Sequence, residues 1–133
     1  MKAETNLKRM LQQLSPVQHD GAYVFVSVPD IPELLRKHLV MHFREMEGHT
    51  LILPRTVADE HQLSYDFIAA WITLKVHSAL AAVGLTAAFS THLAKAGISC
   101  NVVAGYYHDH IFVAEADAQR AMELLENLAA SAN

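Results

Sequence analysis

The sequence has little of several features that would restrict its location and function. It contains one cysteine, Cys100, so no internal disulfide can form and a reducing compartment is expected. Its longest apolar runs, Phe67–Ile72 and Ala79–Leu85, are too short to cross a bilayer. The opening residues, from Met1 to Asn6, lack the apolar stretch of a secretory signal. These absences predict a cytoplasmic protein that does not bind membranes.

Positive charge is also scarce. The chain of 133 residues has 10 Lys and Arg against 14 Asp and Glu, which gives a formal charge of −4 with its nine histidines neutral. The basic residues are scattered, and only Lys8-Arg9 and Arg36-Lys37 are adjacent. A nucleic-acid surface needs clustered Lys and Arg to neutralise phosphates. The composition therefore predicts no nucleic-acid partner.

Motifs of catalysis are missing as well. The sequence has no glycine loop that would cradle a phosphate, no serine-centred elbow and no pair of carboxylates at a useful spacing. Cys100 lies between Ile98 and Val102 on the inward face of an expected strand, which favours a buried thiol over a nucleophile. The prediction is that the protein is not an enzyme and uses no cofactor.

The first half alternates helical and extended patterns. Leu7, Met10, Leu11 and Leu14 are spaced as one face of a helix, which ends at Ser15-Pro16. Strands are expected over Ala22–Val28, Leu39–Glu45 and His49–Leu53, with only a short helical turn or a loop at Pro29–Lys37 and a short helix capped by Thr56.

The second half shows a similar pattern with longer helices. A strand is expected at Ala70–Val76, followed by a helix over Leu85–Ala96 that stops at Gly97. Ile98–Tyr106 and Ile111–Ala114 are predicted to pair around a turn at His108-Asp109. The last helix follows a cap at Asp117 and buries one stripe of side chains, Ala118, Ala121, Met122, Leu125 and Leu128.

These halves form an internal repeat. The pattern of Ala22–Val28 matches that of Ala70–Val76, and Thr50–Pro54 matches His110–Ala114. Each half has the order strand, variable segment, hairpin, helix, and only the second keeps a full helix in the variable segment. This order predicts an α+β fold with antiparallel sheets and helices on one face of each. The expected divisions are an N-terminal helix at 1–16, units at 17–65 and 66–130, and a frayed tail at 131–133.

The order of elements in residues 70–128 resembles the ACT domain, a ferredoxin-like module that binds ligands on enzymes regulated by amino acids. The resemblance is closest in Gly84-Leu85-Thr86, which opens a helix, and in Lys95–Asn101, which leads into the next strand. The segment Asn101–His110 is similar to one in small, stand-alone bacterial proteins with two ACT domains. The resemblance implies two such units in one chain, similar to the paired regulatory domains of aspartate kinases. The missing helix in the first half departs from the family pattern.

The best candidate site is the loop Ser78–Thr86. The N-terminus of a helix carries unpaired N–H groups and partial positive charge, so it favours a carboxylate. Gly84 would allow close approach of a ligand, and Ser99 and Asn101 share a strand face that would orient an amino group. In ACT proteins that resemble this chain, an amino acid binds against such a helix start. The predicted ligand-binding residues are Val83, Gly84, Leu85, Thr86, Ser99, Asn101 and His77.

Other interpretations stay open. One alternative is that Gly84 serves only the turn and Thr86 caps the helix. His108-Asp109-His110 places two imidazoles on one strand face, but a hairpin tip cannot complete a tetrahedral shell, so turn chemistry is favoured and no metal site is predicted. The first functional hypothesis is a regulatory protein that binds an amino acid or similar carboxylate. The alternatives are an interaction module without a small ligand, and a small enzyme that uses the histidine-rich hairpin.

The chain is also expected to form a homodimer or larger oligomer. The side chains of Val40, His42 and Arg44 in the first half leave a mixed sheet face that no predicted helix covers. Ser99, Asn101 and Val103 do the same in the second half. In proteins of the ACT family, which this chain resembles, sheets of this kind commonly pair with a second copy.

Overall fold

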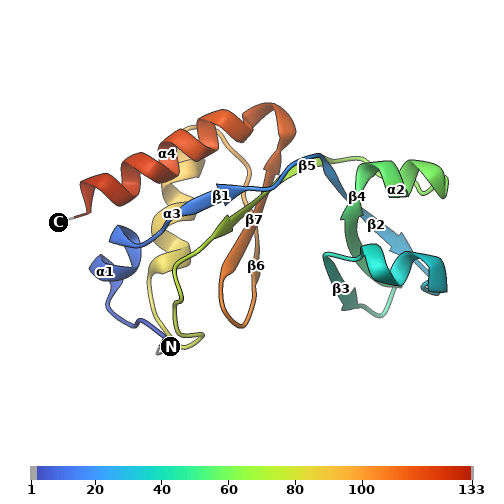
Figure 1. Ribbon diagram of the computed structural model, residues 1–133, viewed down its shortest axis with the longest axis horizontal. Helices are drawn as coiled ribbons and strands as arrows, with labels where there is room; N and C mark the ends of the chain where they lie inside the picture. The colour runs from blue at the N-terminus through green and yellow to red at the C-terminus, as the bar shows by residue number, and fades with distance from the viewer. Residues whose placement is uncertain (1–2, 133) are drawn as a thin grey trace. The chain divides into compact units, whose positions relative to one another are not determined.

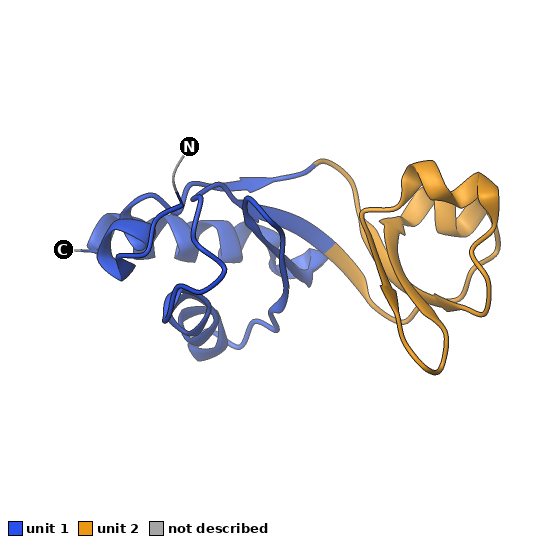
Figure 2. Cartoon of the chain, turned by 90° about the horizontal axis from the view of Figure 1, so that it is seen from below, with its two compact units in different colours: residues 1–19, 70–133 blue, residues 20–69 orange. Residues whose placement is uncertain are grey.

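The computed structural model describes residues 3–132 of the chain. The chain divides into two compact units (Figure 2): unit 1 comprises residues 1–19 and 70–133, and unit 2 comprises residues 20–69. Among the described residues no helix is both long and apolar enough to cross a membrane.

Unit 1 contains strands and helices from both ends of the chain (Figure 1). Its elements are α1 (Leu7–Gln12), β1 (Pro16–Gln18), β5 (Ile68–Leu74), α3 (Leu85–Lys95), β6 (Asn101–Ala104), β7 (Asp109–Ala114), the 3-10 helix η2 (Glu115–Asp117) and α4 (Ala118–Ser131). The strand order is β1-β5-β7-β6, and the pairs β1–β5 and β6–β7 are antiparallel.

Strand β1 explains why the N-terminal segment belongs to unit 1. Pro16, Val17 and Gln18 pair with Leu74, Thr73 and Ile72 of β5. Proline is tolerated at the start of a short strand because it has no N–H to donate to a ladder. The sequence predicted a helix for 1–16 and no strand after it, whereas the structure adds β1 and divides the chain at 19/20 and 69/70.

Unit 2 has the same order of elements in a shorter form. It contains β2 (Tyr23–Val28), the 3-10 helix η1 (Glu33–His38), β3 (Met41–Arg44), β4 (His49–Pro54) and α2 (Arg55–Glu60). The first residues of β5, Ile68 and Ala69, pair with β2, so the strand order is β5-β2-β4-β3 with antiparallel pairs. The predicted α+β fold with antiparallel strands is confirmed.

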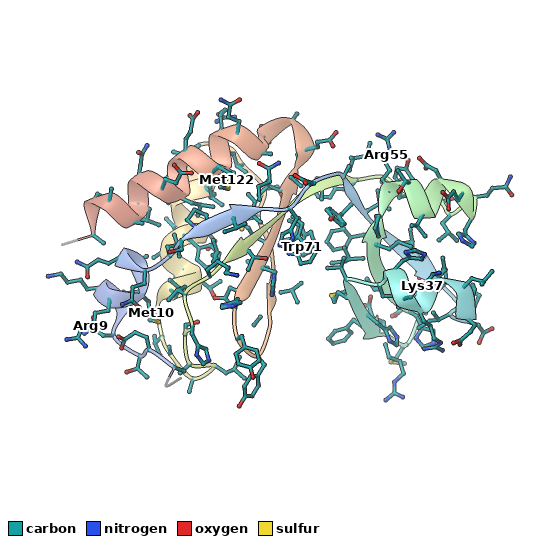
Figure 3. The ribbon with its side chains drawn as sticks, viewed as in Figure 1. Arg9, Met10, Lys37, Arg55, Trp71 and Met122 are labelled. Carbon is teal, nitrogen blue, oxygen red and sulfur yellow. The ribbon has the colours of Figure 1, made fainter. Side chains whose placement is uncertain are left out.

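Each unit has its own apolar core. In unit 1, Ile72 of β5 and Ile111 of β7 pack with Phe89 of α3 and Leu125 of α4, and all four are almost completely buried. Met10 of α1, labelled in Figure 3, joins the same cluster. Because both helices cover the face that alternate residues of β5 and β7 present, they lie on one side of the sheet, as the pattern predicted.

The core of unit 2 is smaller. It gathers alternate residues of β2 with β4 and the short helices, and its buried members are Val24, Val26, Val28, Leu35, Leu51, Leu53, Val57 and Ala58. Leu35 is the one residue that η1 buries completely. The variable segment of this half is therefore a single short 3-10 helix, as its prolines indicated.

Three local predictions were wrong. Thr56 lies inside α2, whose N-cap is Pro54. Thr86 lies in the first turn of α3, where Gly84 is the N-cap and no side chain caps the helix. Asp109 does not form the hairpin turn: the turn lies at Tyr106 and Tyr107, and Asp109 opens β7 opposite Ala104.

Candidate functional site

The first backbone N–H groups of α3 have no acceptor among the described residues. Gly84 has φ 102°, a left-handed conformation that glycine adopts freely. The first intrahelical bond in the helix runs from the Ala88 N–H to the Gly84 carbonyl. No described residue accepts a hydrogen bond from the N–H groups of Leu85 and Thr86, so the partial positive charge of this eleven-residue helix faces outward.

A hollow of about 150 Å³ lies at this helix start. One wall is the loop that runs from Ser78 to Thr86, and the other is the end of the β6–β7 hairpin. Its lining residues are Ser78, Ala79, Leu80, Ala82, Gly84, Leu85, Thr86, Ala104, Gly105 and Asp109. Two segments about twenty residues apart in the sequence thus form one site within unit 1.

A second hollow of about 430 Å³ shares Ser78, Ala79 and Leu80 with the first, so the two adjoin. Its aromatic lining comes from His77, Tyr106 and Tyr107. The His77 and Tyr107 rings lie 5.5 Å apart between centroids, and the Tyr106 and Tyr107 rings lie 5.1 Å apart. This second space suits the apolar or planar part of a ligand.

The structure brings together only some of the predicted site residues. Gly84, Leu85 and Thr86 line the smaller hollow, and His77 lines the larger one. The Val83 side chain is 85% exposed and lines neither.

Ser99 and Asn101 also lie outside both hollows. Ser99 is exposed and precedes β6, which begins only at Asn101. The Asn101 side chain donates a hydrogen bond to the Phe112 carbonyl at 3.2 Å, so its amide serves the β6–β7 pair. The prediction that these two residues orient an amino group therefore has no support in the geometry.

Asp109 is the site residue that sequence reasoning missed. Its side chain lines the smaller hollow and is 8% exposed, and burial raises the pKa of its carboxyl group. The alternation along β7 could have identified it, because Asp109 has the same parity as Ile111 and Val113, which face the core. Its position beside an expected turn led to the wrong assignment.

A second polar cluster lies on the other face of the unit 1 sheet. The Trp71 indole, labelled in Figure 3, donates to His110 Nδ1 at 3.1 Å, and Thr73 Oγ1 lies 2.9 Å from the same nitrogen. His19 Nε2 lies 2.7 Å from Thr73 Oγ1, and its ring stacks on Trp71. Indole N–H only donates, so His110 Nδ1 must accept and the imidazole is neutral. Burial, and then the nearby charges of His108 and His19, lower the pKa of His110.

Two further candidates from the sequence were the thiol of Cys100 and a metal site. Cys100 is half-buried against the core, and burial raises the pKa of its thiol to about 11, so the thiol stays protonated at neutral pH. Among residues 3–132, no group of three or more His, Cys, Asp or Glu side chains is arranged to hold a metal ion.

Comparisons with known proteins agree with the two-unit architecture. Two family models match the chain, each described as ACT domain, one over residues 2–70 and the other over residues 67–127. A search among curated proteins found no match.

Solved structures resemble the chain over most of its length. A Vibrio cholerae protein of unknown function, described as a possible transport protein, is 46% identical, with 92% of this chain and 95% of that chain covered and a TM-score of 0.83. An Agrobacterium tumefaciens protein is 19% identical (82% and 84% covered, TM-score 0.62). The ligand-free regulatory subunit of aspartate kinase from Thermus thermophilus is 10% identical (87% and 97% covered, TM-score 0.62), which shows a shared ferredoxin-like fold.

Proposed function

The chain belongs to the ACT domain family, and from this premise we propose that it is a regulatory protein whose unit 1 binds a small amino acid or similar carboxylate. The observation that supports this proposal most strongly is the hollow at the start of α3, where no residue in the described part of the chain accepts a hydrogen bond from the Leu85 and Thr86 N–H groups. A carboxylate placed there would accept both hydrogen bonds and meet the positive end of the helix.

Regulation is the role that this family and these neighbours support in general terms. The solved structures that resemble the chain include regulatory subunits of aspartate kinase, and the two family models that match are both described as ACT domain. A ligand that orders the loop Ser78–Thr86 would also fix the β6–β7 hairpin, because both segments line the same hollow. We expect the ligand to act by this local ordering.

The test is a thermal-shift screen of the full chain against the twenty amino acids. A ligand that binds only the folded state raises the unfolding midpoint, by an amount that grows with its concentration. We expect one chemical group of amino acids to raise the midpoint in a saturable way. A screen in which none does so at millimolar concentration would contradict the proposal and favour an interaction module without a small ligand.

We propose further that the chain assembles with a second copy. Strand β3 ends the strand order of unit 2, and β6 ends that of unit 1, so each is paired along one edge only. Phe43 of β3 is 64% exposed and Met46, which follows it, is fully exposed. Sedimentation at micromolar concentration should give a mass above 14.7 kDa, and a monomer at all concentrations would exclude this proposal.

A further inference from the structure

A chain of hydrogen bonds joins the segment after β1 to β5 and β7, on the face of the unit 1 sheet opposite the helices. His19, which follows β1, is linked through Thr73 Oγ1 of β5 to Nδ1 of His110 in β7, over contacts of 2.7 and 2.9 Å. Trp71 of β5 donates its indole N–H to the same Nδ1 atom at 3.1 Å. These four side chains form the imidazole cluster. None of them lines either hollow, so the proposed ligand site does not account for them.

The donors and acceptors of the imidazole cluster fit one arrangement of protons. The Trp71 indole N–H can only donate, so Nδ1 of His110 carries no proton. The Thr73 hydroxyl must then donate to that nitrogen, because two lone pairs would otherwise meet at 2.9 Å. Since its one proton is used there, Thr73 Oγ1 accepts from Nε2–H of His19. His110 is therefore the neutral tautomer with its proton on Nε2.

The ring of His110 has little room to turn away from these donors. A Cβ added at Gly105 would lie 3.2 Å from Nε2 of His110, so the hairpin backbone is close to the far side of the ring. The Trp71 ring lies 5.8 Å away between centroids, and Val103 of β6 is the cross-strand neighbour. A second proton on His110 would therefore place an N–H group directly against the indole N–H of Trp71.

The charges around His110 oppose that second proton as well. Burial, and then the positive charges of His108 and His19, lower the pKa of the His110 imidazole. The neighbours from β5 and β6 are uncharged, and they are Trp71, Thr73 and Val103. Three other charged residues lie within two positions of a cluster member, and they are exposed Asp20, exposed Lys75 and Asp109, which lines the smaller hollow.

The imidazole cluster lies where the chain leaves and re-enters unit 1. The chain leaves this unit after His19 and returns at Ala70. The His19 ring stacks on the Trp71 ring with centroids 3.5 Å apart, and the His19 backbone N–H donates to the Trp71 carbonyl at 2.9 Å. The cluster and this backbone bond therefore fasten the departing segment to the returning strand within unit 1.

We propose that the imidazole cluster is a proton-operated clamp, which holds the segment after β1 against β5 while His110 is neutral and releases that segment when Nδ1 of His110 takes up a proton. The proton removes the acceptor of the Trp71 indole. It also leaves two cations, His110 and His19, on either side of Thr73 Oγ1, where both donate and repel each other. This response to acid is a property of the ligand-free chain, so it is independent of the proposed function.

The experiment follows the ligand-free full chain by NMR from pH 8 to pH 5. Trp71 is the one tryptophan of the chain, so its indole N–H gives a single identifiable signal. The imidazole nitrogens of His110 report the tautomer, and deuterium exchange of the His19 backbone N–H reports release of the segment. His110→Gln is compared with His61→Gln, an exposed control in unit 2. The wild-type measurements do not depend on whether a variant folds.

At pH 7.5 we expect His110 to have a bare Nδ1 and a protonated Nε2. The indole signal should move with a midpoint below 6.5, the ordinary pKa of histidine. The protection of the His19 N–H, corrected for the intrinsic effect of pH on exchange, should fall about tenfold with the same midpoint. Amides of β4, which is paired on both edges, should keep their protection. His61→Gln should follow the wild type, and His110→Gln should show neither transition.

Three results would overturn the proposal. A proton on Nδ1 of His110 at pH 7.5 would contradict the hydrogen-bond arrangement from which it starts. A wild-type indole signal that does not titrate, or that titrates equally in His110→Gln, would remove His110 as the proton sensor. Loss of protection in β4 together with that of His19 would show that acid unfolds the whole chain and releases no single segment.

Discussion

After β5, unit 1 carries the eleven-residue helix α3, whereas after β2 unit 2 carries the six-residue 3-10 helix η1. The two hairpins that follow have matching registers, since Met41 pairs with Ile52 in unit 2 and Asn101 pairs with Phe112 in unit 1. The framework is therefore repeated, and the difference is concentrated in the segment that would create a ligand site.

The residue that opens the second strand of the hairpin differs as well. The residue of unit 2 that opens β4, as Asp109 opens β7, is His49. Its Nδ1 lies 2.7 Å from Nε2 of His42, so it already has a partner. Unit 2 lacks both the long helix and the buried carboxylate, which explains why we expect one ligand site per chain. The comparison shows that a repeated fold does not imply a repeated site.

The largest expected effect comes from removing one buried side chain from the core of each unit and comparing stability and binding. Phe89→Ala removes the side chain that anchors α3 and should lower the free energy of unfolding by about 3–5 kcal/mol. The matched change in unit 2, Leu35→Ala, should cost about 2–5 kcal/mol. Urea denaturation measures both, and a ligand titration follows on each folded variant. We expect Leu35→Ala to keep amino-acid binding and Phe89→Ala to lose it; the reverse result would place the site in unit 2.

A smaller effect should come from the glycine at the start of α3. Gly84→Ala places a Cβ at φ 102° and within 3.1 Å of Leu7 Cδ2, so it should cost about 1–2 kcal/mol or slightly more. Gly97→Ala is the matched control, because φ is 76° there and no atom lies within 4 Å of the added Cβ. Thermal denaturation should show the greater loss for Gly84→Ala. If the two variants lose the same thermal stability, the contact with Leu7 does not constrain the loop.

The loss of folding stability at acid pH should come from unit 1. The folded state lowers the pKa of His110 below its ordinary value of 6.5, through burial first and then through His108 and His19. The folded state therefore binds fewer protons, so stability that is present above pH 6.5 is lost as the pH falls through the folded-state pKa. Thermal midpoints between pH 8 and 5 should fall less steeply for His110→Gln than for the wild type. His61→Gln, an exposed control in unit 2, should follow the wild type.

The smallest expected effect tests whether a carboxylate at the start of the second hairpin strand is enough to create a ligand site without a long helix. His49→Asp gives unit 2 a carboxylate where unit 1 has Asp109, but it supplies no long helix. The number of amino acids bound per chain, measured by calorimetry, should remain one. A second site in this variant would show that the helix start contributes little to binding.

Sequence patterns identified the fold because the two cores follow simple periods. The stripe of α4 and the alternation of β5 and β7 each place their apolar residues on one face, and the structure buries them there. The left-handed stop at Gly97, with φ 76°, was likewise predictable from the residue itself. Strand β1 was not, because three residues are too few to establish a period.

Among the residues that line the smaller hollow, the predicted binding residues are those at the helix start. Gly84, Leu85 and Thr86 are neighbours in the sequence, so local pattern reasoning found them together. Asp109 lies at the same hollow through the pairing of β6 with β7. Its parity with Ile111 and Val113 indicated an inward face, but the sequence pattern did not show which segment it would contact across the hairpin. Asn101 was misplaced for the same reason, since its amide bonds to Phe112 across the hairpin.

The most direct test of a single site in unit 1 is a two-dimensional NMR titration of the full chain with each amino acid that raises the midpoint. We expect saturable changes in the amide signals of Leu85, Thr86 and Asp109, and none within residues 20–69 beyond those of a control titration with sodium chloride. Saturable changes confined to residues 20–69, or distributed without reference to the hollow, would contradict it.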